Sequence, residues 1–292
     1  MKLLITIPHY VEAGPGQYGS TGGNAAGRAT MLHEVLASLH RAFGPRQSQL
    51  LNRRHNIRRL ANRAAEAQLD IVVCTTQGRH ALTALPPDTS LSTHRPTQAE
   101  PLLLGFACHG VLAERIGVYD WYGYMEDDLI LQDPLFFDKL AWFLDQAGSD
   151  ALLLPHRYEI RPGSAEKLYI DGHLSADFAA PWQSAADREP LACQALGTPV
   201  VFERPHNPHA GCFFLNAAQM AHWAAQPHFG DHDTAFAGPL ESAATLGMLK
   251  TFRIHKPALE SAGFLEIRHA GNRYLGNWLD RPGVPRQPRW VG

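Results

Sequence analysis

Three consecutive acidic residues, Glu126, Asp127 and Asp128, directly follow a run of aromatic and apolar residues from Val118 to Met125. Aromatic and apolar residues of this kind suit a buried strand. Carboxylates cannot be buried there cheaply, because an unpaired charge in a low dielectric is strongly disfavoured or shifts its pKa. We therefore expect the three acids at the carboxyl end of the strand, facing a crevice and a positive partner. In an open α/β sheet, that crevice is where ligands bind.

The first half of the chain alternates between strand-like and helix-like segments. Short apolar runs predict strands at residues 2–7 and 69–75. Apolar residues predict helices at residues 28–43, where they recur at helical spacing, and 102–116. Residues 47–67 also have helical composition, and their many arginines predict a solvated helix face or, less favoured, a phosphate-binding face. Residues 78–100 are rich in Pro and Thr and are expected to be irregular. This order predicts a largely parallel sheet with covering helices.

The second half contains further elements of both kinds. The same patterns predict helices at residues 135–146, 217–225 and 239–249, and strands at residues 151–155, 211–216 and 251–254. Residues 156–207 are expected to form an irregular insertion or a second lobe that shares the core of the first half, with short strand-like pieces at 168–170 and 200–202. A polar tail is expected from Arg268 onward. We see neither a linker nor an internal repeat and expect one domain over residues 1–292.

Composition narrows the class of protein. The formal net charge of −2, with histidine counted as neutral, gives no overall field that would recruit nucleic acid or an anionic membrane. The first apolar run stops at Pro8-His9, too early for a signal peptide, and no apolar segment approaches the ~20 residues of a membrane span. The cysteines are far apart and match no zinc-binding spacing. We expect a cytoplasmic protein without a transmembrane segment, with a peripheral position at the inner membrane surface as the alternative.

The spacing of the acidic residues suggests a metal site. Glu126 and Asp128 stand two residues apart, so on an extended chain their side chains point to the same side and can reach one divalent cation. Asp127 points elsewhere, where it can accept hydrogen bonds from a ribose or from a Lys or Arg side chain. This arrangement resembles the D-x-D motif of the GT-A glycosyltransferases, which use nucleotide-sugar donors.

The resemblance implies a fold and a reaction. The fold would be α/β, a GT-A (Rossmann-like) mixed, mostly parallel sheet flanked by helices, with an irregular acceptor-side region. Residues 1–134 would form the nucleotide-binding half, and residues 135–292 the acceptor-binding half and C-terminal tail. The enzyme would use Mn²⁺ or Mg²⁺, a UDP- or GDP-linked sugar donor, and an acceptor hydroxyl on a glycan, a lipid or a small molecule.

The resemblance also implies residues on the far side of the site. Glu241, in the segment Gly238–Gly247, would be the catalytic base of an inverting enzyme. Ser242 stands where many members have Asp, and the structural alternative for Glu241 is a first-turn acid stabilised by the helix dipole. His269 is the preferred third metal ligand, ahead of His255.

Other positions implied by the resemblance would bind the substrates. Arg268 and Arg273 are placed to neutralise the donor diphosphate. The remaining candidates are Pro8, His9, Tyr10 and Thr75 for the nucleotide, and His209 and Gly211 for the acceptor side. Tyr10 either stacks on the base or packs in the core.

Three alternatives stay open. A nucleotidyltransferase would use the same metal on an α-phosphate. A metal-dependent hydrolase would use the His- and Asp-rich segment His228–Asp233, for which a polar loop is the favoured structural interpretation. A nucleotide- or carbohydrate-binding module without catalysis is the third. The glycine-rich stretch Gly14–Asn24 is expected to be a loop that orders on ligand binding; it lacks the spacing of a dinucleotide-binding or P-loop motif.

Overall fold

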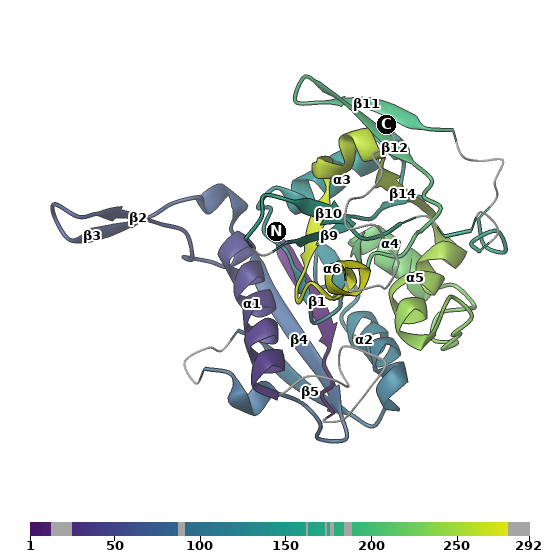
Figure 1. Cartoon of the computed structure of the whole chain (residues 1–292), viewed down its shortest axis with the longest axis horizontal. Coiled ribbons are helices and arrows are strands. Elements are labelled where there is room, and N and C mark those ends of the chain that lie inside the picture. The colour runs from purple at the N-terminus through teal and green to yellow at the C-terminus, as the bar shows by residue number, and fades with distance from the viewer. Residues whose placement is uncertain are drawn as a thin grey trace.

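A five-stranded sheet forms the centre of the fold (Figure 1). The structure is a computed structural model that describes residues 1–12, 25–86, 91–161, 163–172, 174–175, 178–183 and 189–279. The strand order is β13-β6-β1-β4-β5, with bounds β1 Lys2–Pro8, β4 Gln68–Thr76, β5 Thr93–Thr97, β6 Trp121–Met125 and β13 Cys212–Asn216. Strands β6, β1, β4 and β5 are parallel, and β13 is antiparallel to β6. The predicted mixed, mostly parallel sheet is confirmed.

Helices cover the sheet. Helix α1 (Ala25–Phe43) contacts β4, and α2 (Leu104–Ala113) contacts β1 and β4. Consecutive residues of β1, from Leu3 to Ile7, are buried, so both faces of this strand are covered. A strand buried on both faces has an unbroken apolar sequence, which is why β1 could be predicted at the very start of the chain.

The prediction that residues 78–100 are irregular is wrong in part. A 3₁₀ turn at Leu82–Ala84 is followed by β5, which extends the sheet beside β4. Strand β5 lies at the sheet edge and is largely exposed. An edge position tolerates Pro96 inside the strand, because one side of the strand needs no backbone donor.

The helix predicted over residues 47–67 is also wrong. This segment is a hairpin of β2 (Gln49–Asn52) and β3 (Ile57–Leu60), followed by a 3₁₀ turn at Arg63–Ala65. The turn between the strands places Asn56 at a φ of 50°, and the backbone N–H of His55 donates to the Asn52 side chain. These local features override the helix propensity of Gln, Leu and Arg. The hairpin projects from the body of the molecule (Figure 1).

Two further sheets of four strands make up much of the second half, in the orders β10-β9-β15-β7 and β11-β12-β14-β8. Their strands are β7 Leu129–Ile130, β8 Ala151–Leu153, β9 His156–Ile160, β10 Lys167–Tyr169, β11 Leu191–Ala195, β12 Thr198–Glu203, β14 Arg253–Pro257 and β15 Glu266–His269. Residues 156–207 are therefore only partly irregular. The tail predicted from Arg268 is likewise wrong up to residue 279, because β15 pairs with β7 and β9 and is followed by α6 (Arg273–Leu279).

The remaining helices agree with the predicted ones. They are α3 Phe136–Ala147, α4 Ala217–Ala224 and α5 Pro239–Thr251, and short 3₁₀ turns occur at Pro101–Leu103 and Leu259–Phe264. No helix within the described residues is long and apolar enough to cross a membrane.

Close packing at Gly123 fixes the path of β6. A Cβ atom on Gly123 would lie 2.6 Å from Ile5 Cδ1 and 2.7 Å from Phe214 Cδ1, on the two neighbouring strands. Glycine therefore lets β1, β6 and β13 pack tightly around the strand that leads to the acidic residues.

Candidate active site

The acidic residues lie at the carboxyl edge of the central sheet, as predicted. Strand β6 ends at Met125 and runs parallel to β1, which ends at Pro8. The backbone of the acidic segment binds two distant parts of the chain. The N–H of Glu126 donates to the Gly211 carbonyl at 2.9 Å, and the N–H of Ala270 donates to the Asp128 carbonyl at 2.8 Å. Late segments of the chain are thereby held against the end of β6.

Asp127 is buried and fully paired. Both of its carboxylate oxygens lie 2.5 Å from Arg28 Nη2, and Oδ2 also lies 2.5 Å from His9 Nδ1. The other ring nitrogen of His9 accepts from the Ala81 N–H at 3.1 Å, so the proton between His9 and Asp127 is on Nδ1. Burial alone would raise the pKa of Asp127, but Arg28 and His9 together lower it to about 2. The expected Lys or Arg partner of Asp127 is thus Arg28.

Glu126 and Asp128 flank Asp127 where the chain leaves β6 and turns. Burial and the Asp128 charge raise the pKa of Glu126 to about 7, against the opposing effects of Arg157 and His269. The nearest Arg157 nitrogen, Nη1, lies 3.7 Å from Glu126 Oε2. Among the described residues, Asp128 Oδ1 is buried and has no hydrogen-bond partner. These two carboxylates therefore retain unused capacity for a cation.

His269 completes this side of the site. Its Nδ1 lies 2.8 Å from Glu159 Oε1, and its Nε2 lies 3.4 Å from Asp128 Oδ2. Burial alone would lower the pKa of His269, but hydrogen bonds with Asp128 and Glu159 raise it to about 9. The ring is consequently protonated at neutral pH, and its Nε2 becomes available as a metal ligand only after losing that proton.

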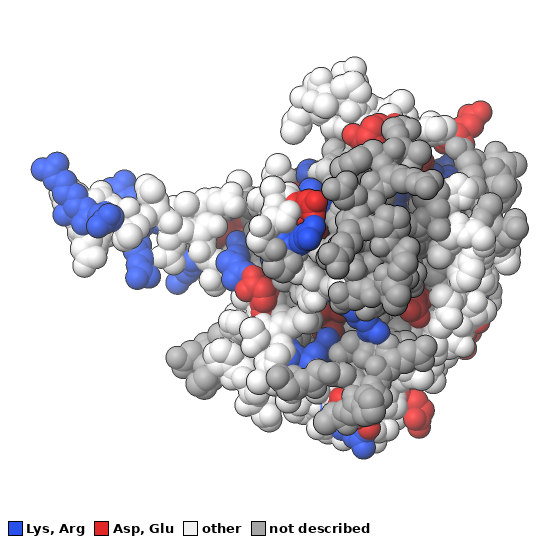
Figure 2. Space-filling model, in the orientation of Figure 1, with Lys and Arg blue, Asp and Glu red and all other residues white. Residues whose placement is uncertain are grey.

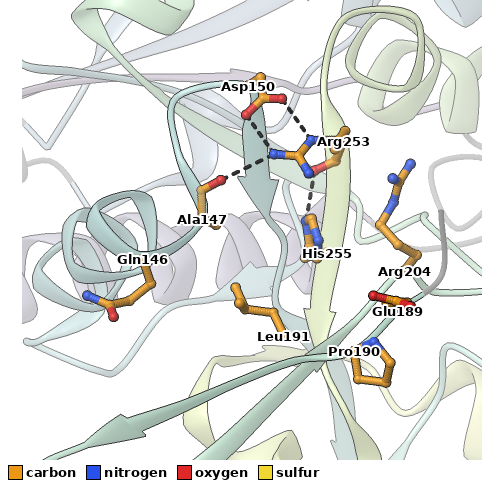
Figure 3. A pocket seen from close by; sticks show the side chains of 9 residues that line it. All are labelled: Gln146, Ala147, Asp150, Glu189, Pro190, Leu191, Arg204, Arg253 and His255. Carbon is orange, nitrogen blue, oxygen red and sulfur yellow. Dashed lines mark hydrogen bonds and ion pairs between the residues drawn. The ribbon is translucent and has the colours of Figure 1, made fainter.

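His255, the alternative to His269, lies in a different pocket. That pocket is lined by residues from the end of α3, from β11 and from β14, and Figure 3 shows His255 beside the ion pair of Asp150 with Arg253. None of the acidic residues at the end of β6 lines it. The His255 Nδ1 donates to the Arg253 carbonyl at 3.0 Å, and burial lowers the His255 pKa to about 4. The structure therefore brings His269, and not His255, to the acidic residues.

Charged residues that the sequence did not single out lie behind Glu126. Arg157 on β9 donates from Nε to Asp171 at 2.9 Å, and Lys256 Nζ donates to the same carboxylate at 3.0 Å. Lys256 is fully buried and also donates to the His209 carbonyl at 2.6 Å. Burial alone would raise the pKa of Asp171, but Arg157 and Lys256 lower it far below its usual range. The partly exposed Glu126 and the buried side chains of Arg157, Asp171 and Lys256 therefore form a row of alternating charges.

Glu159, also on β9, was missed as well. It is fully buried, and besides His269 it accepts from the backbone N–H groups of Tyr274 at 3.2 Å and Leu275 at 2.7 Å. Arg157 and Glu159 stand two residues apart on a strand, the same spacing as Glu126 and Asp128. That spacing alone does not distinguish buried charges from solvated ones, so no sequence pattern indicated these two residues.

Glu241 lies in the first turn of α5 and is half-buried. Its charge contributes to the raised pKa of Glu126, so the two carboxylates share one electrostatic environment. Gly238 provides space for it, because a Cβ atom there would lie 2.9 Å from Glu241 Oε2. Ser242 has a structural role: its Oγ donates to the Phe236 carbonyl and accepts from the Phe236 N–H.

The predicted nucleotide contacts lie at the carboxyl ends of β1 and β4. Pro8 ends β1, and Thr75 is buried with its Oγ1 2.7 Å from His94 Nε2. Tyr10 is half-buried, and its hydroxyl bonds to Glu12 and Arg79 at 3.1 Å each. The glycine-rich stretch Gly14–Asn24 lies outside the described residues.

The predicted acceptor-side residues lie in the segment just before β13, where the Gly211 carbonyl accepts from the Glu126 N–H. His209 is buried, with Nδ1 2.9 Å from Thr245 Oγ1. Gly211 has a φ of 63°, and a Cβ atom there would lie 2.5 Å from Glu126 Oε2. Gly211 therefore makes room for the Glu126 carboxylate. Arg273, predicted to contact the diphosphate, is exposed at the start of α6.

The His- and Asp-rich segment forms a polar loop, as favoured. Lys250 Nζ lies 2.8 Å from Asp231 and 2.7 Å from Asp233, and His228 bonds to Thr251. Across the part of the chain that the structure describes, no three His, Cys, Asp or Glu side chains are already arranged to enclose a metal ion. A cation at Glu126 and Asp128 would therefore need ligands from outside the protein.

Comparison with known proteins gives distant similarity only. No protein-family model matches the sequence, and no curated protein matches it. The solved structure of S. aureus TarS 1–349 is similar over 94% of this chain and 62% of TarS 1–349, with 11% identity and a TM-score of 0.46. The structure of TarS 1–349 in complex with UDP-GlcNAc is similar over 88% of this chain and 56% of that chain, with 12% identity and a TM-score of 0.39. The structure of a mycobacterial protein is similar over 97% of this chain and 76% of that protein, with 13% identity and a TM-score of 0.43. With TM-scores below 0.5, these similarities assign no activity to this chain.

Proposed function

We propose that the chain is a metal-dependent glycosyltransferase that moves a sugar from a nucleotide diphosphate sugar, UDP- or GDP-linked, to an acceptor hydroxyl on a glycan, a lipid or a small molecule. The observation that carries this proposal is the position of Glu126 at the carboxyl edge of a mostly parallel sheet, where the charges of Asp128, His269 and Glu241 all act on its carboxylate. Carboxylates gathered at such an edge, with buried cationic groups beside them, suit a ligand that carries a cation and phosphates.

Glu126 and Asp128 would hold the Mn²⁺ or Mg²⁺. These ions are commonly bound by one or two carboxylates, with water and substrate phosphates in the other positions, so a site without three protein ligands in place is compatible with this role. The unpartnered Asp128 Oδ1 supports it, and so does the raised pKa of Glu126, which reflects too little positive charge around that carboxylate. His269 would become the third ligand after deprotonation. A bound cation would supply charge neutralisation for the leaving diphosphate.

Glu241 would serve as the base. In an inverting transfer, the acceptor oxygen forms a bond to the anomeric carbon while the bond from that carbon to the diphosphate oxygen breaks. The electron pair leaves with the nucleoside diphosphate, and the acceptor proton passes to Glu241. The half-buried position of Glu241 in the first turn of α5 leaves its carboxylate accessible to an acceptor.

On the donor side, Asp127 holds Arg28 and His9 beneath the end of β1, which positions Pro8 and Tyr10. Tyr10 is the residue we assign to stacking on the base, and Arg273 to contact with the diphosphate. Thr75 lines the end of β4, and Gly211 and His209 support Glu126 on the acceptor side.

A thermal-shift panel of UDP-, GDP-, CMP- and dTDP-sugars, with and without Mn²⁺, tests the donor class. We expect stabilisation by one nucleotide that depends on the metal ion. If no nucleotide sugar stabilises the protein under either condition, the proposal is wrong.

Glu241→Gln tests the base, and Glu260→Gln is its matched control, since Glu260 is an exposed first-turn acid of another helical turn. We expect Glu241→Gln to lower turnover about 100-fold or more while nucleotide binding is retained. The control should leave turnover unchanged. Equal and small effects of the two substitutions would show that Glu241 only stabilises its helix.

A further inference from the structure

The β2–β3 hairpin carries a concentration of unpaired positive charge. Between Arg46 and Ala65 the chain has arginines but no acidic residue. The side chains concerned are all exposed: Arg46, Arg53, Arg54, Arg58, Arg59 and Arg63. Figure 2 shows these basic side chains along the projecting arm. Exposed arginines on the body, such as Arg41, Arg95 and Arg161, pair with carboxylates, whereas within the described residues none of the hairpin arginine side chains forms an ion pair.

Apolar side chains alternate with this charge. Leu50 is 63% exposed and Leu51 57%, and Ile57 and Leu60 are each 46% exposed. The strand register pairs Leu50 with Arg59 on one face and Leu51 with Arg58 on the other. Each face of the hairpin thus presents a leucine beside an arginine, and neither face is purely apolar or purely charged.

We propose that this hairpin docks the protein on an anionic lipid bilayer. Arginine binds lipid phosphates through its guanidinium group while its stem remains in apolar surroundings, and Leu and Ile side chains enter the boundary between head groups and acyl chains. A hairpin with both residue types on both faces matches that boundary. The net charge of the whole chain conceals this feature, because the carboxylates are on the body.

Other occupants fit less well. The hairpin segment has no Phe, Trp or Tyr on which a nucleic-acid base could stack, and it exposes leucine instead. A second copy of the chain would bring two arms of the same strong positive charge together. Charge complementarity therefore selects an anionic surface, and the exposed leucines select one with an apolar layer.

Vesicle flotation of the full chain tests the proposal. The probes are vesicles of phosphatidylcholine alone and vesicles that also contain phosphatidylglycerol. We expect binding to the anionic vesicles and little to the neutral ones, with most binding lost near 1 M salt, where the Debye length is about 3 Å. Absence of binding to the anionic vesicles, or equal binding to both kinds, would overturn the proposal.

The variant Arg53→Gln/Arg54→Gln/Arg58→Gln/Arg59→Gln should weaken vesicle binding by up to several hundredfold, since each of the four arginines contributes about fivefold near an anionic leaflet and the contributions multiply. The matched control removes the same charge from exposed body positions: Arg41→Gln/Arg95→Gln/Arg161→Gln/Arg253→Gln. It should change binding only slightly. Equal losses in the two variants would show that net charge alone, and not the hairpin, is responsible.

Leu50→Ser/Leu51→Ser tests apolar insertion without altering charge. We expect it to weaken binding several-fold and to remove the fraction that survives high salt. Because both residues are exposed, the variant should unfold at the wild-type temperature. Unchanged vesicle binding would overturn insertion, and tight binding to a DNA or RNA oligonucleotide with no preference for lipid would overturn the choice of a bilayer.

Discussion

The two sides of the Glu126–Asp128 segment differ in how well charge is compensated. On one side, Asp127 has Arg28 and His9 against its oxygens and a pKa of about 2. On the other side, Glu126 has too little positive charge around it, so that its pKa is about 7, and Asp128 Oδ1 has no hydrogen-bond partner among the described residues. Adjacent residues of one loop thus have opposite shifts. A carboxylate whose charge is fully compensated by its partners stabilises the structure, whereas a carboxylate whose charge is not compensated is available to bind a ligand.

The largest expected effect on stability comes from removing the counter-charge of Asp127, the compensated carboxylate. Arg28→Met leaves the Asp127 carboxylate buried without its main counter-charge, and we expect a loss of about 3–5 kcal/mol in the free energy of unfolding. Urea denaturation measures it. Arg41→Met, at an exposed ion pair, is the control and should cost at most about 1 kcal/mol. A loss for Arg28→Met as small as that of the control would contradict the contrast.

Substitution of Glu126, the uncompensated carboxylate, should affect activity without lowering stability. Glu126→Gln keeps the shape of the side chain and removes a charge that repels Asp128, so we expect stability at pH 8 to be equal to wild type or about 1 kcal/mol higher. Glycosyl transfer should fall about 100-fold. The comparison is Asp127→Asn, which should lose stability. If Glu126→Gln is destabilised as much as Asp127→Asn, the two sides are equivalent and the contrast fails.

The pH dependence of stability sharpens the comparison. The folded state retains the Glu126 proton up to a pKa of about 7 instead of 4.5, and the His269 proton up to about 9 instead of 6.5. Their contributions are therefore lost as pH rises, Glu126 between pH 4.5 and 7 and His269 between 6.5 and 9. Asp127 behaves oppositely, and its contribution is lost as pH falls from 3.8 towards 2.

These contributions are measured by urea denaturation of wild type and variant at a series of pH values, as the difference between their free energies of unfolding. His269→Gln should be destabilised by about 1–3 kcal/mol at pH 6, and the difference should diminish towards pH 9. A difference that stays constant with pH would mean that the His269 pKa is not raised on folding.

The smallest expected effect concerns the metal ion. His269 would have to lose a proton before Nε2 could bind a cation, and Glu126 is already deprotonated above pH 7. Mn²⁺ affinity should therefore increase by up to about tenfold per pH unit between pH 7 and 9. Titration calorimetry in buffers with different ionisation enthalpies counts the released protons. His255→Gln should leave affinity and proton release unchanged. An affinity that does not depend on pH would exclude His269 as a ligand.

Much of the central sheet could be predicted because its strands are buried on both faces. The unbroken apolar runs of β1, β4 and β6 can be read directly, and the end of β6 predicts where the acidic residues lie. The hairpin could not be found in this way. Its strands are exposed, so no apolar periodicity marks them, and their Gln, Leu and Arg residues favour helix when considered locally.

The site could be predicted on the side where the acidic residues are consecutive. The charged residues on β9 could not be predicted. Arg157 and Glu159 alternate there with His156, Tyr158 and Ile160 inside a segment rich in polar residues. A charged residue in such a segment is normally solvated. Its burial depends on partners distant in the chain: Asp171 for Arg157, and His269 for Glu159.

The bonds of Glu159 connect the His269 side of the site to the end of the described chain. One carboxylate receives the His269 ring and the first backbone N–H groups of α6. Deprotonating His269 reduces the attraction between that ring and Glu159, and releasing α6 would let Glu159 turn away from His269. The two events are therefore reciprocally linked: a ligand that changes the charge of His269 changes the affinity of α6 for the body of the protein by the same factor.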